Sequence, residues 1–338
     1  MAAQDIEYVE LYTSDERAAV EYFVSSFGFT PVAESLGDSC HSSLLRQGGV
    51  QLVVTAGPET EEFLEAHGEG IADIAFACDD AVRARDAAVA AGASLIRSEP
   101  GRHVVSGLFG ANHSLVARSV GGRAPADRSW ARLPDTPVRP AGHIRLLDHV
   151  AVCVGGGTLA DAADHYTSAF GLPRYSSEYV EVGEQGLDSI VVRSPSGGIT
   201  FTILEQDPKK KPGQIHGFLS RNDGPGVQHL AFLVDDIVSA VREYSGRGID
   251  FLSTPGRYYG MLADRLPGVR AEIGELRATN VLADRDEWGY LLQLFTRSPY
   301  KRNTLFYELI QRRGARGFGG ANIKALYEAV ERDGLATG

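Results

Sequence analysis

Two segments of this chain recur as near-copies, and in each case only the second copy contains a histidine. Residues 70–80 read GIADIAFACDD and residues 226–236 read GVQHLAFLVDD, so His229 stands where the first copy has Asp73. Upstream, IEYVELY (6–12) matches LDHVAVC (147–153), so His149 stands where the first half has Tyr8. Because both differences fall at equivalent positions, the pattern indicates a duplicated scaffold in which only one half holds a metal site.

A third candidate ligand is Glu308, the one acid in the β-forming stretch TLFYELIQR (304–312). Burying a carboxylate in such a strand is costly without a counter-charge, which a metal ion would supply. Two histidines and a carboxylate suit non-haem Fe(II), because they leave three positions open, whereas zinc more often takes a tetrahedral site. The residues alone also allow hydrogen-bonded core histidines and a Glu308 that pairs with Arg312 or Arg313.

Four similar units must position these side chains. Each unit begins with a strand and a helix and continues with further strands, and the helix ends YFVSSFGF and HYTSAFGL agree between the first and third units. Strand alternation should turn His149 and His229 into one cavity. The order predicts an α+β fold of four βαβββ units in two domains, with open, curled barrel-like sheets. Ser14 is the expected N-cap of the first helix.

The polar stretch 118–143 contains four prolines and shows neither helical nor strand periodicity. We expect it to connect the halves, which predicts an N-terminal domain at 1–120, a linker at 121–145 and a C-terminal domain at 146–338.

Composition and charge exclude several classes of protein. The formal charge is −11 without a basic stripe, which argues against a nucleic-acid or anionic membrane partner. No apolar stretch approaches the ~20 residues of a membrane helix. The N-terminus lacks a signal pattern, and three widely spaced cysteines form no CxxC, so we expect a reducing cytoplasm. The sequence leaves the oligomeric state open, with a homodimer as one option.

The motifs GVQHLAF, GYLLQLFT, TLFYELIQR and GFGGANIKALYEAVE resemble those of the 4-hydroxyphenylpyruvate dioxygenase family. The similarity extends from Ile6 to about Glu331 and implies the vicinal-oxygen-chelate fold. It also implies an Fe(II) cofactor held by His149, His229 and Glu308, a substrate pair of 4-hydroxyphenylpyruvate and O2, and an N-terminal half that is a scaffold without metal.

The resemblance further implies a set of pocket residues. Polar substrate contacts fall on Ser189, Gln214 and Gln293, and aromatic walls on Phe306 and Phe318. It also implies that residues 322–332, whose apolar positions have helical spacing, form a lid that closes the pocket through Ile323.

Gln228 precedes a candidate ligand in the sequence. By strand alternation it faces away from His229, so we expect it to support that ligand rather than to contact substrate.

Three positions bear on which product forms. Thr202 and Leu204 stand where homogentisate-forming members have proline and asparagine, and Ile323 stands where they have phenylalanine. These residues look like the branch that hydroxylates the benzylic carbon to give 4-hydroxymandelate, a precursor of hydroxyphenylglycine for peptide antibiotics. Homogentisate formation in tyrosine breakdown is the alternative. A non-catalytic ligand-sequestering protein of the same fold is a further one, and a glyoxalase-like isomerase a weaker one.

Overall fold

The computed structural model describes residues 3–37, 39–118, 124–125, 127–134 and 142–324. Its N-terminal domain is a nine-stranded sheet in the order β6-β7-β8-β5-β1-β4-β3-β2-β9. The first unit comprises β1 (Ala3–Tyr12), α1 (Glu16–Tyr22), η1 (Phe23–Phe27), β2 (Thr30–Leu36), β3 (His41–Gln47) and β4 (Val50–Ala56). After η2 (Pro58–Thr60) and α2 (Glu61–His67), the second comprises β5 (Gly70–Cys78), α3 (Ala81–Ala90), β6 (Leu95–Glu99), β7 (Arg102–Ser106) and β8 (Asn112–Ala117).

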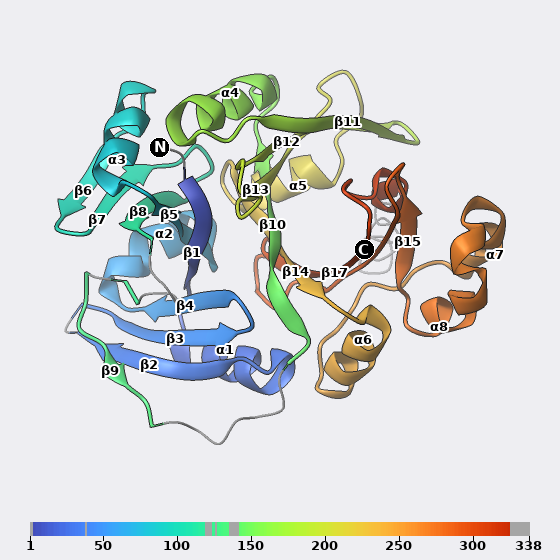
Figure 1. Ribbon diagram of the computed structural model, residues 1–338, viewed down its shortest axis with the longest axis horizontal. Coiled ribbons are helices and arrows are strands. Elements are labelled where there is room, and N and C mark those ends of the chain that lie inside the picture. The colour runs from blue at the N-terminus through green and yellow to red at the C-terminus, as the bar shows by residue number, and fades with distance from the viewer. Residues whose placement is uncertain (1–2, 38, 119–123, 126, 135–141, 325–338) are drawn as a thin grey trace.

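The C-terminal domain repeats this plan in an eight-stranded sheet, in the order β11-β12-β13-β10-β14-β17-β16-β15 (Figure 1). Its first unit comprises β10 (Ile144–Val154), α4 (Leu159–Phe170), β11 (Arg174–Val182), β12 (Gln185–Arg193) and β13 (Thr200–Gln206). After α5 (Gln214–Arg221), its second comprises β14 (Gly226–Val234), α6 (Ile237–Gly246), α7 (Gly256–Arg265), η3 (Pro267–Glu272), α8 (Ile273–Ala278), β15 (Leu282–Arg285), β16 (Tyr290–Phe295) and β17 (Phe306–Arg313). The predicted four βαβββ units are therefore present, the last with α7, η3 and α8 inserted.

Aspartates, not the predicted Ser14, cap the first helix in three of the four units. The Asp15 carboxylate accepts a hydrogen bond from the Ala18 amide, while the Ser14 hydroxyl donates to Glu69 instead. Asp80 and Asp236 cap α3 and α6 in the same way. A carboxylate at the N-cap satisfies a free backbone amide and interacts favourably with the helix dipole, which explains the preference.

The two domains share one hydrophobic core. Alternate strand residues such as Val150 and Phe232 pack with the helices and with the other domain, whereas the opposite faces form smaller clusters inside each curled sheet. At the junction, the buried His113 ring of the N-terminal domain stacks on Phe76. Its Nε2 atom lies 2.5 Å from the hydroxyl oxygen of Tyr166 in the C-terminal domain. The interiors of the two sheets therefore remain separate from the interface between domains.

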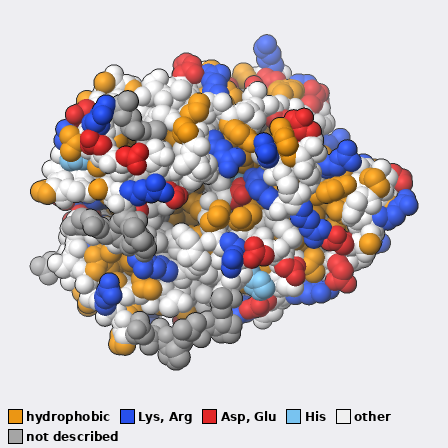
Figure 2. All heavy atoms as spheres, viewed as in Figure 1, with side chains coloured by type: hydrophobic (Ala, Val, Ile, Leu, Met, Phe, Trp, Pro, Cys, Tyr) orange, Lys and Arg blue, Asp and Glu red, His pale blue; other side chains and the backbone are white. Residues whose placement is uncertain are grey.

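Part of the expected linker joins the N-terminal sheet. β9 (Ala131–Arg132) pairs with β2, which the proline-rich composition did not predict. Just before it, Arg128 forms an ion pair with Glu10 at 2.9 Å and another with Asp127 at 3.0 Å. These contacts anchor the described part of the linker. No helix among the described residues is long and apolar enough to span a membrane, and acidic and basic side chains are interspersed on the face shown in Figure 2.

Candidate metal centre

His149, His229 and Glu308 meet inside the C-terminal sheet. β10 and β14 are antiparallel neighbours, β17 runs parallel to β14, and their register sets His149 opposite Ala231 and Ala231 opposite Glu308. One ligand atom from each of the three side chains lies within 4.8 Å of the others. Glu308 Oε2 lies 3.4 Å from His149 Nε2 and 3.2 Å from His229 Nε2. The three buried side chains thus converge from adjacent strands, as the sequence predicts.

The donor set fits a divalent metal ion. His229 Nε2 is buried, and although it lies 3.2 Å from Glu308 Oε2 it makes no well-aligned hydrogen bond with any of the described residues. An unpaired buried nitrogen is costly unless its lone pair is used, as it would be by a metal ion. Two imidazoles and one carboxylate on the same side of such an ion leave further positions for exogenous ligands.

The charges in this site depend strongly on one another. Burial lowers the pKa of His229, because the imidazolium is poorly solvated there. Burial also opposes protonation of His149, yet the carboxylates of Glu308 and Asp148 raise the pKa of His149 to about 9. Although burial alone would raise the pKa of Glu308, the facing histidines lower it. A proton on His149 thus balances the carboxylate without metal, and metal binding would displace that proton.

Each histidine is oriented by the residue that precedes it. His149 Nδ1 lies 2.9 Å from an oxygen of Asp148, and His229 Nδ1 lies 3.2 Å from Gln228 Oε1. The pairing of β10 with β14 shifts register at both Asp148 and Gln228, which marks a bulge at each. A bulge re-aims a side chain, and Gln228 consequently lines the same cavity as His229. The prediction that Gln228 faces away was therefore wrong, because alternation holds only in a regular strand.

Asp148 is itself held by an arginine. Arg312 approaches its carboxylate through two hydrogen bonds of 2.7 Å, and also stacks over the Phe318 ring at 5.1 Å. Arg313 pairs with Glu272, so neither arginine takes the alternative role of partner to Glu308. The Arg312 ion pair and the His149 hydrogen bond lower the pKa of Asp148 despite its burial. The permanent carboxylate fixes the His149 ring with Nε2 directed at the centre.

A second chain of hydrogen bonds holds Glu308. Gln293 Nε2 donates to Glu308 Oε1 at 3.1 Å, and Asn322 Nδ2 donates to Gln293 Oε1 at 2.9 Å. The Tyr258 hydroxyl in turn donates to Asn322 Oδ1 at 2.9 Å. Gln293 points inward as expected, but both ends of its amide are occupied. This role of Asn322 was not predicted from the sequence, because the residue is fully buried although it lies in a polar, glycine-rich segment.

The cavity beside the triad contains most of the predicted pocket residues. Thr202, Leu204, Gln214, Gln293, Phe318 and Ile323 line it, together with Gln228. Three apolar residues that the sequence did not indicate also line it, namely Leu187, Ile215 and Phe295.

Two of the expected pocket residues lie outside this lining. The Ser189 hydroxyl donates to the Glu178 carbonyl, and Phe306 stacks on the His229 ring. Of the expected lid helix, the described chain includes residues up to 324, and its later positions lie outside the described residues.

Comparison with known proteins agrees with this geometry. Residues 1–116 match the family model described as "Hydroxyphenylpyruvate dioxygenase, HPPD, N-terminal", and residues 146–294 match "Glyoxalase/Bleomycin resistance protein/Dioxygenase superfamily". The 4-hydroxyphenylpyruvate dioxygenase of Yarrowia lipolytica is 32% identical over 97% of this chain and 91% of that protein. This chain belongs to the 4-hydroxyphenylpyruvate dioxygenase family.

Two further relatives extend the comparison. The 4-hydroxyphenylpyruvate dioxygenase of Aspergillus fumigatus is 31% identical over 97% of this chain and 92% of that protein. A solved structure of a triple variant of 4-hydroxymandelate synthase from Streptomyces coelicolor is 51% identical, with a TM-score of 0.91, and covers 98% of this chain and 99% of that one. The family and the vicinal-oxygen-chelate fold predicted from the sequence are confirmed.

The N-terminal domain shows what this dioxygenase-family scaffold contains when it lacks the ligand set. Tyr8 and Asp73 occupy the positions of the two histidines. Phe76 lies opposite Leu115 in the first domain, just as Phe232 lies opposite Leu309 in the second, so Ser114 is the counterpart of Glu308.

An arginine occupies the centre of this N-terminal counterpart. The Arg102 guanidinium lies 3.5 Å from the Asp73 carboxylate and 3.0 Å from the Ser114 hydroxyl, and it pairs with Asp127 of the linker at 2.9 Å. The register of β7 with β8 and of β16 with β17 makes Arg102 the counterpart of Gln293. One position therefore supplies a cation in the first domain and a neutral amide beside the candidate metal centre in the second.

Proposed function

We propose that this protein is an Fe(II)-dependent 4-hydroxymandelate synthase. It would convert 4-hydroxyphenylpyruvate and O2 into 4-hydroxymandelate and CO2, a product that can supply hydroxyphenylglycine to peptide antibiotics. The observation that carries the proposal is 51% identity to a 4-hydroxymandelate synthase over nearly the whole of both chains. The convergent histidines and glutamate support a metal-dependent reaction.

His149, His229 and Glu308 would hold the iron, which when bound supplies open positions for the keto acid and O2. Asp148 and Gln228 keep the Nε2 atoms of the two histidines directed at the centre, because each occupies the Nδ1 side of its ring. Gln293 holds the second oxygen of Glu308. We therefore assign Gln293 to positioning a ligand, in place of the substrate contact expected from the resemblance.

Unpaired polar atoms in the cavity indicate where a polar substrate would bind. Thr202 Oγ1 and Gln214 Nε2 are buried without a hydrogen-bond partner among the described residues, and both side chains line the cavity. Buried polar groups are costly when unpaired, so we infer that they bond to the carboxyl, keto or phenol oxygens of the substrate. Leu187, Ile215 and Phe295 supply the apolar wall that a phenyl ring requires.

The same cavity supports benzylic hydroxylation over ring attack. Leu204 is apolar and 6% exposed, and it packs in a small cluster that includes Ile323 at its edge. Leu204 lacks the amide that asparagine would offer to an oxygen on the substrate ring. Ile323 is smaller than phenylalanine and leaves more space for the ring to turn away from the metal. A change of about an ångström in position would decide which carbon reacts.

The competing function is homogentisate formation, favoured by the names of the fungal relatives. Incubation of the Fe(II)-loaded protein with 4-hydroxyphenylpyruvate under air, followed by chromatography and mass spectrometry, separates the two. We expect 4-hydroxymandelate as the main product, and homogentisate as the main product would refute the proposal. In the double variant Leu204→Asn with Ile323→Phe, the product should shift toward homogentisate. An unchanged ratio would show that these side chains do not select the product.

A further inference from the structure

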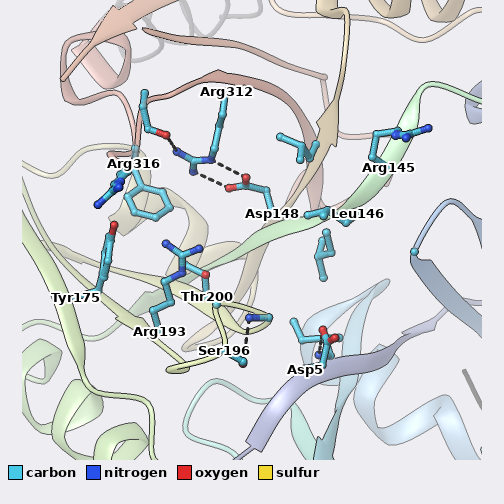
Figure 3. A pocket seen from close by; sticks show the side chains of 18 residues that line it. Asp5, Arg145, Leu146, Asp148, Tyr175, Arg193, Ser196, Thr200, Arg312 and Arg316 are labelled. Carbon is cyan, nitrogen blue, oxygen red and sulfur yellow. Dashed lines mark hydrogen bonds and ion pairs between the residues drawn. The ribbon is translucent and has the colours of Figure 1, made fainter. Parts of the chain in front are cut away.

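A cleft of about 870 Å³ lies between the two domains, outside the metal centre. Its walls include the start of β1, the first half of β10, the start of β11, the end of β12 with the turn that follows it, and the end of β17 with the segment after it (Figure 3). Four arginines line it, namely Arg145, Arg193, Arg312 and Arg316. The cleft therefore gathers positive charge on a chain whose formal net charge is −11.

Two of these arginines are not neutralised by a neighbouring acid. Arg145 pairs with Asp235, and Arg312 pairs with Asp148. In contrast, Arg193 and Arg316 have no carboxylate partner in the described part of the chain. Figure 3 shows the Arg193 guanidinium directed into the cleft, with Asp5 at the opposite end.

Aromatic rings accompany both unpaired cations. Arg193 lies 5.1 Å from the Tyr175 ring, and its buried Nε has no hydrogen-bond partner among the described residues. Arg316 lies 5.1 Å from the half-exposed Trp288 ring. Guanidinium groups beside aromatic surfaces suit a ligand that has both a carboxylate and a ring.

The Phe318 side chain lies at the boundary between this cleft and the inner cavity. Phe318 lines both the cleft and the inner cavity, and its ring contacts His149 at a centroid distance of 5.2 Å. Arg312 stacks on the same ring. A molecule held in the cleft would thus reach the inner cavity by passing the Phe318 ring.

The inner cavity has no arginine or lysine of its own in its described lining. An anionic substrate therefore meets no cationic side chain in that lining before it reaches the metal, and the net charge of the protein repels it at a distance.

We propose that the cleft is the docking site for an aromatic α-keto carboxylate, which binds Arg193 and Arg316 before it passes Phe318. This inference rests on the substrate class of the proposed function. It does not depend on which product forms.

Stopped-flow fluorescence of the full-length Fe(II)-loaded protein under nitrogen tests the proposal with 4-hydroxyphenylpyruvate as the probe. Because Trp288 lies under Arg316, docking should change its emission in a phase that is absent in Trp288→Phe. We expect the association rate constant to fall about tenfold in the double variant Arg193→Gln with Arg316→Gln, and added salt to have less effect there than in the wild type. Arg270→Gln, an exposed control near Asp264, should match the wild type.

An unchanged rate constant in the double variant, or the lack of a Trp288-dependent phase in the wild type, would overturn the docking site. Inorganic phosphate distinguishes a substrate site from a general anion site. Phosphate that gives the same phase at the same concentration as the keto acid would also overturn the proposal, because the aromatic contacts would then be irrelevant. Failure of the proposed function would instead appear as a different product with the same association rate.

Discussion

Gln293→Arg should replace the metal ion with a cation belonging to the chain. In the N-terminal domain, the equivalent position holds Arg102, whose guanidinium pairs with Asp73. Gln293 already contacts Glu308 Oε1 at 3.1 Å, while Oε2 of that carboxylate faces the two histidines. A guanidinium at this point would therefore bind the glutamate beside the metal position.

The size of the effect follows from Coulomb's law. A guanidinium on Glu308 Oε1 would lie about 5 Å from a divalent ion on Oε2, a repulsion of about 7 kcal/mol at an effective dielectric constant of about 20. Side-chain movement would relieve part of this, so we expect metal affinity to fall by at least about a thousandfold, or roughly 4 kcal/mol. The metal-free variant should unfold at the same urea concentration as the metal-free wild type or higher, because Glu308 gains a partner.

Metal affinity can be measured by Co(II) or Fe(II) titration against a competing chelator under nitrogen. The matched control is Gln293→Leu, which removes the hydrogen bond to Glu308 without adding charge and should weaken binding only about 10-fold to 100-fold. Urea unfolding of both variants without metal shows whether they fold. A folded Gln293→Arg protein that keeps one tightly bound metal ion would refute the reasoning.

Three further predictions concern other charged or titratable groups. Asp148→Asn removes the charge that orients His149 and should lower metal affinity about 10-fold to 100-fold in the same titration, whereas wild-type affinity would contradict that role. Arg102→Gln leaves Asp73 among uncompensated acids and should lower the free energy of urea unfolding by about 3 to 5 kcal/mol, and a loss under about 1 kcal/mol would contradict the ion network. Burial at the domain junction lowers the pKa of His113 to about 4, so its stabilising contribution is present above about pH 6.5 and is lost as the pH falls toward 4. That contribution is about 3 kcal/mol, and in His113→Gln the unfolding free energy should vary less with pH over this range. An equally steep pH profile would assign the acid sensitivity to other groups.

The duplication made the two histidines predictable. The residues that flank His149 and His229 match those that flank Tyr8 and Asp73, so the two halves can be aligned from the sequence alone. Glu308 could be identified as an isolated acid in an apolar strand. The same repeats also contained a signal for the helix caps that was missed, since Asp15, Asp80 and Asp236 precede the helices of three units.

Other features of the site arise from pairing between distant segments, which a single sequence does not show. The orientation of Gln228 depends on a bulge in the pairing of β14 with β10. The correspondence of Arg102 with Gln293 depends on sheet register, because β7 and β16 have no recognisable similarity in sequence. Asn322 is held in place by a hydrogen bond from the Tyr258 hydroxyl, which lies far away in the sequence. The positions of these groups are properties of the assembled fold.

The arginine at the centre of the N-terminal sheet would matter most when the metal position of the other domain is empty. A guanidinium is covalently part of the chain, so it cannot be chelated, exchanged for another ion or oxidised. Loss of the metal would leave only a proton on His149 at the centre of the C-terminal domain, whereas the charge at the centre of the N-terminal domain would be unchanged. Since both domains share one core, the permanent cation should help to keep the whole chain folded as a reserve that regains its metal when the supply returns.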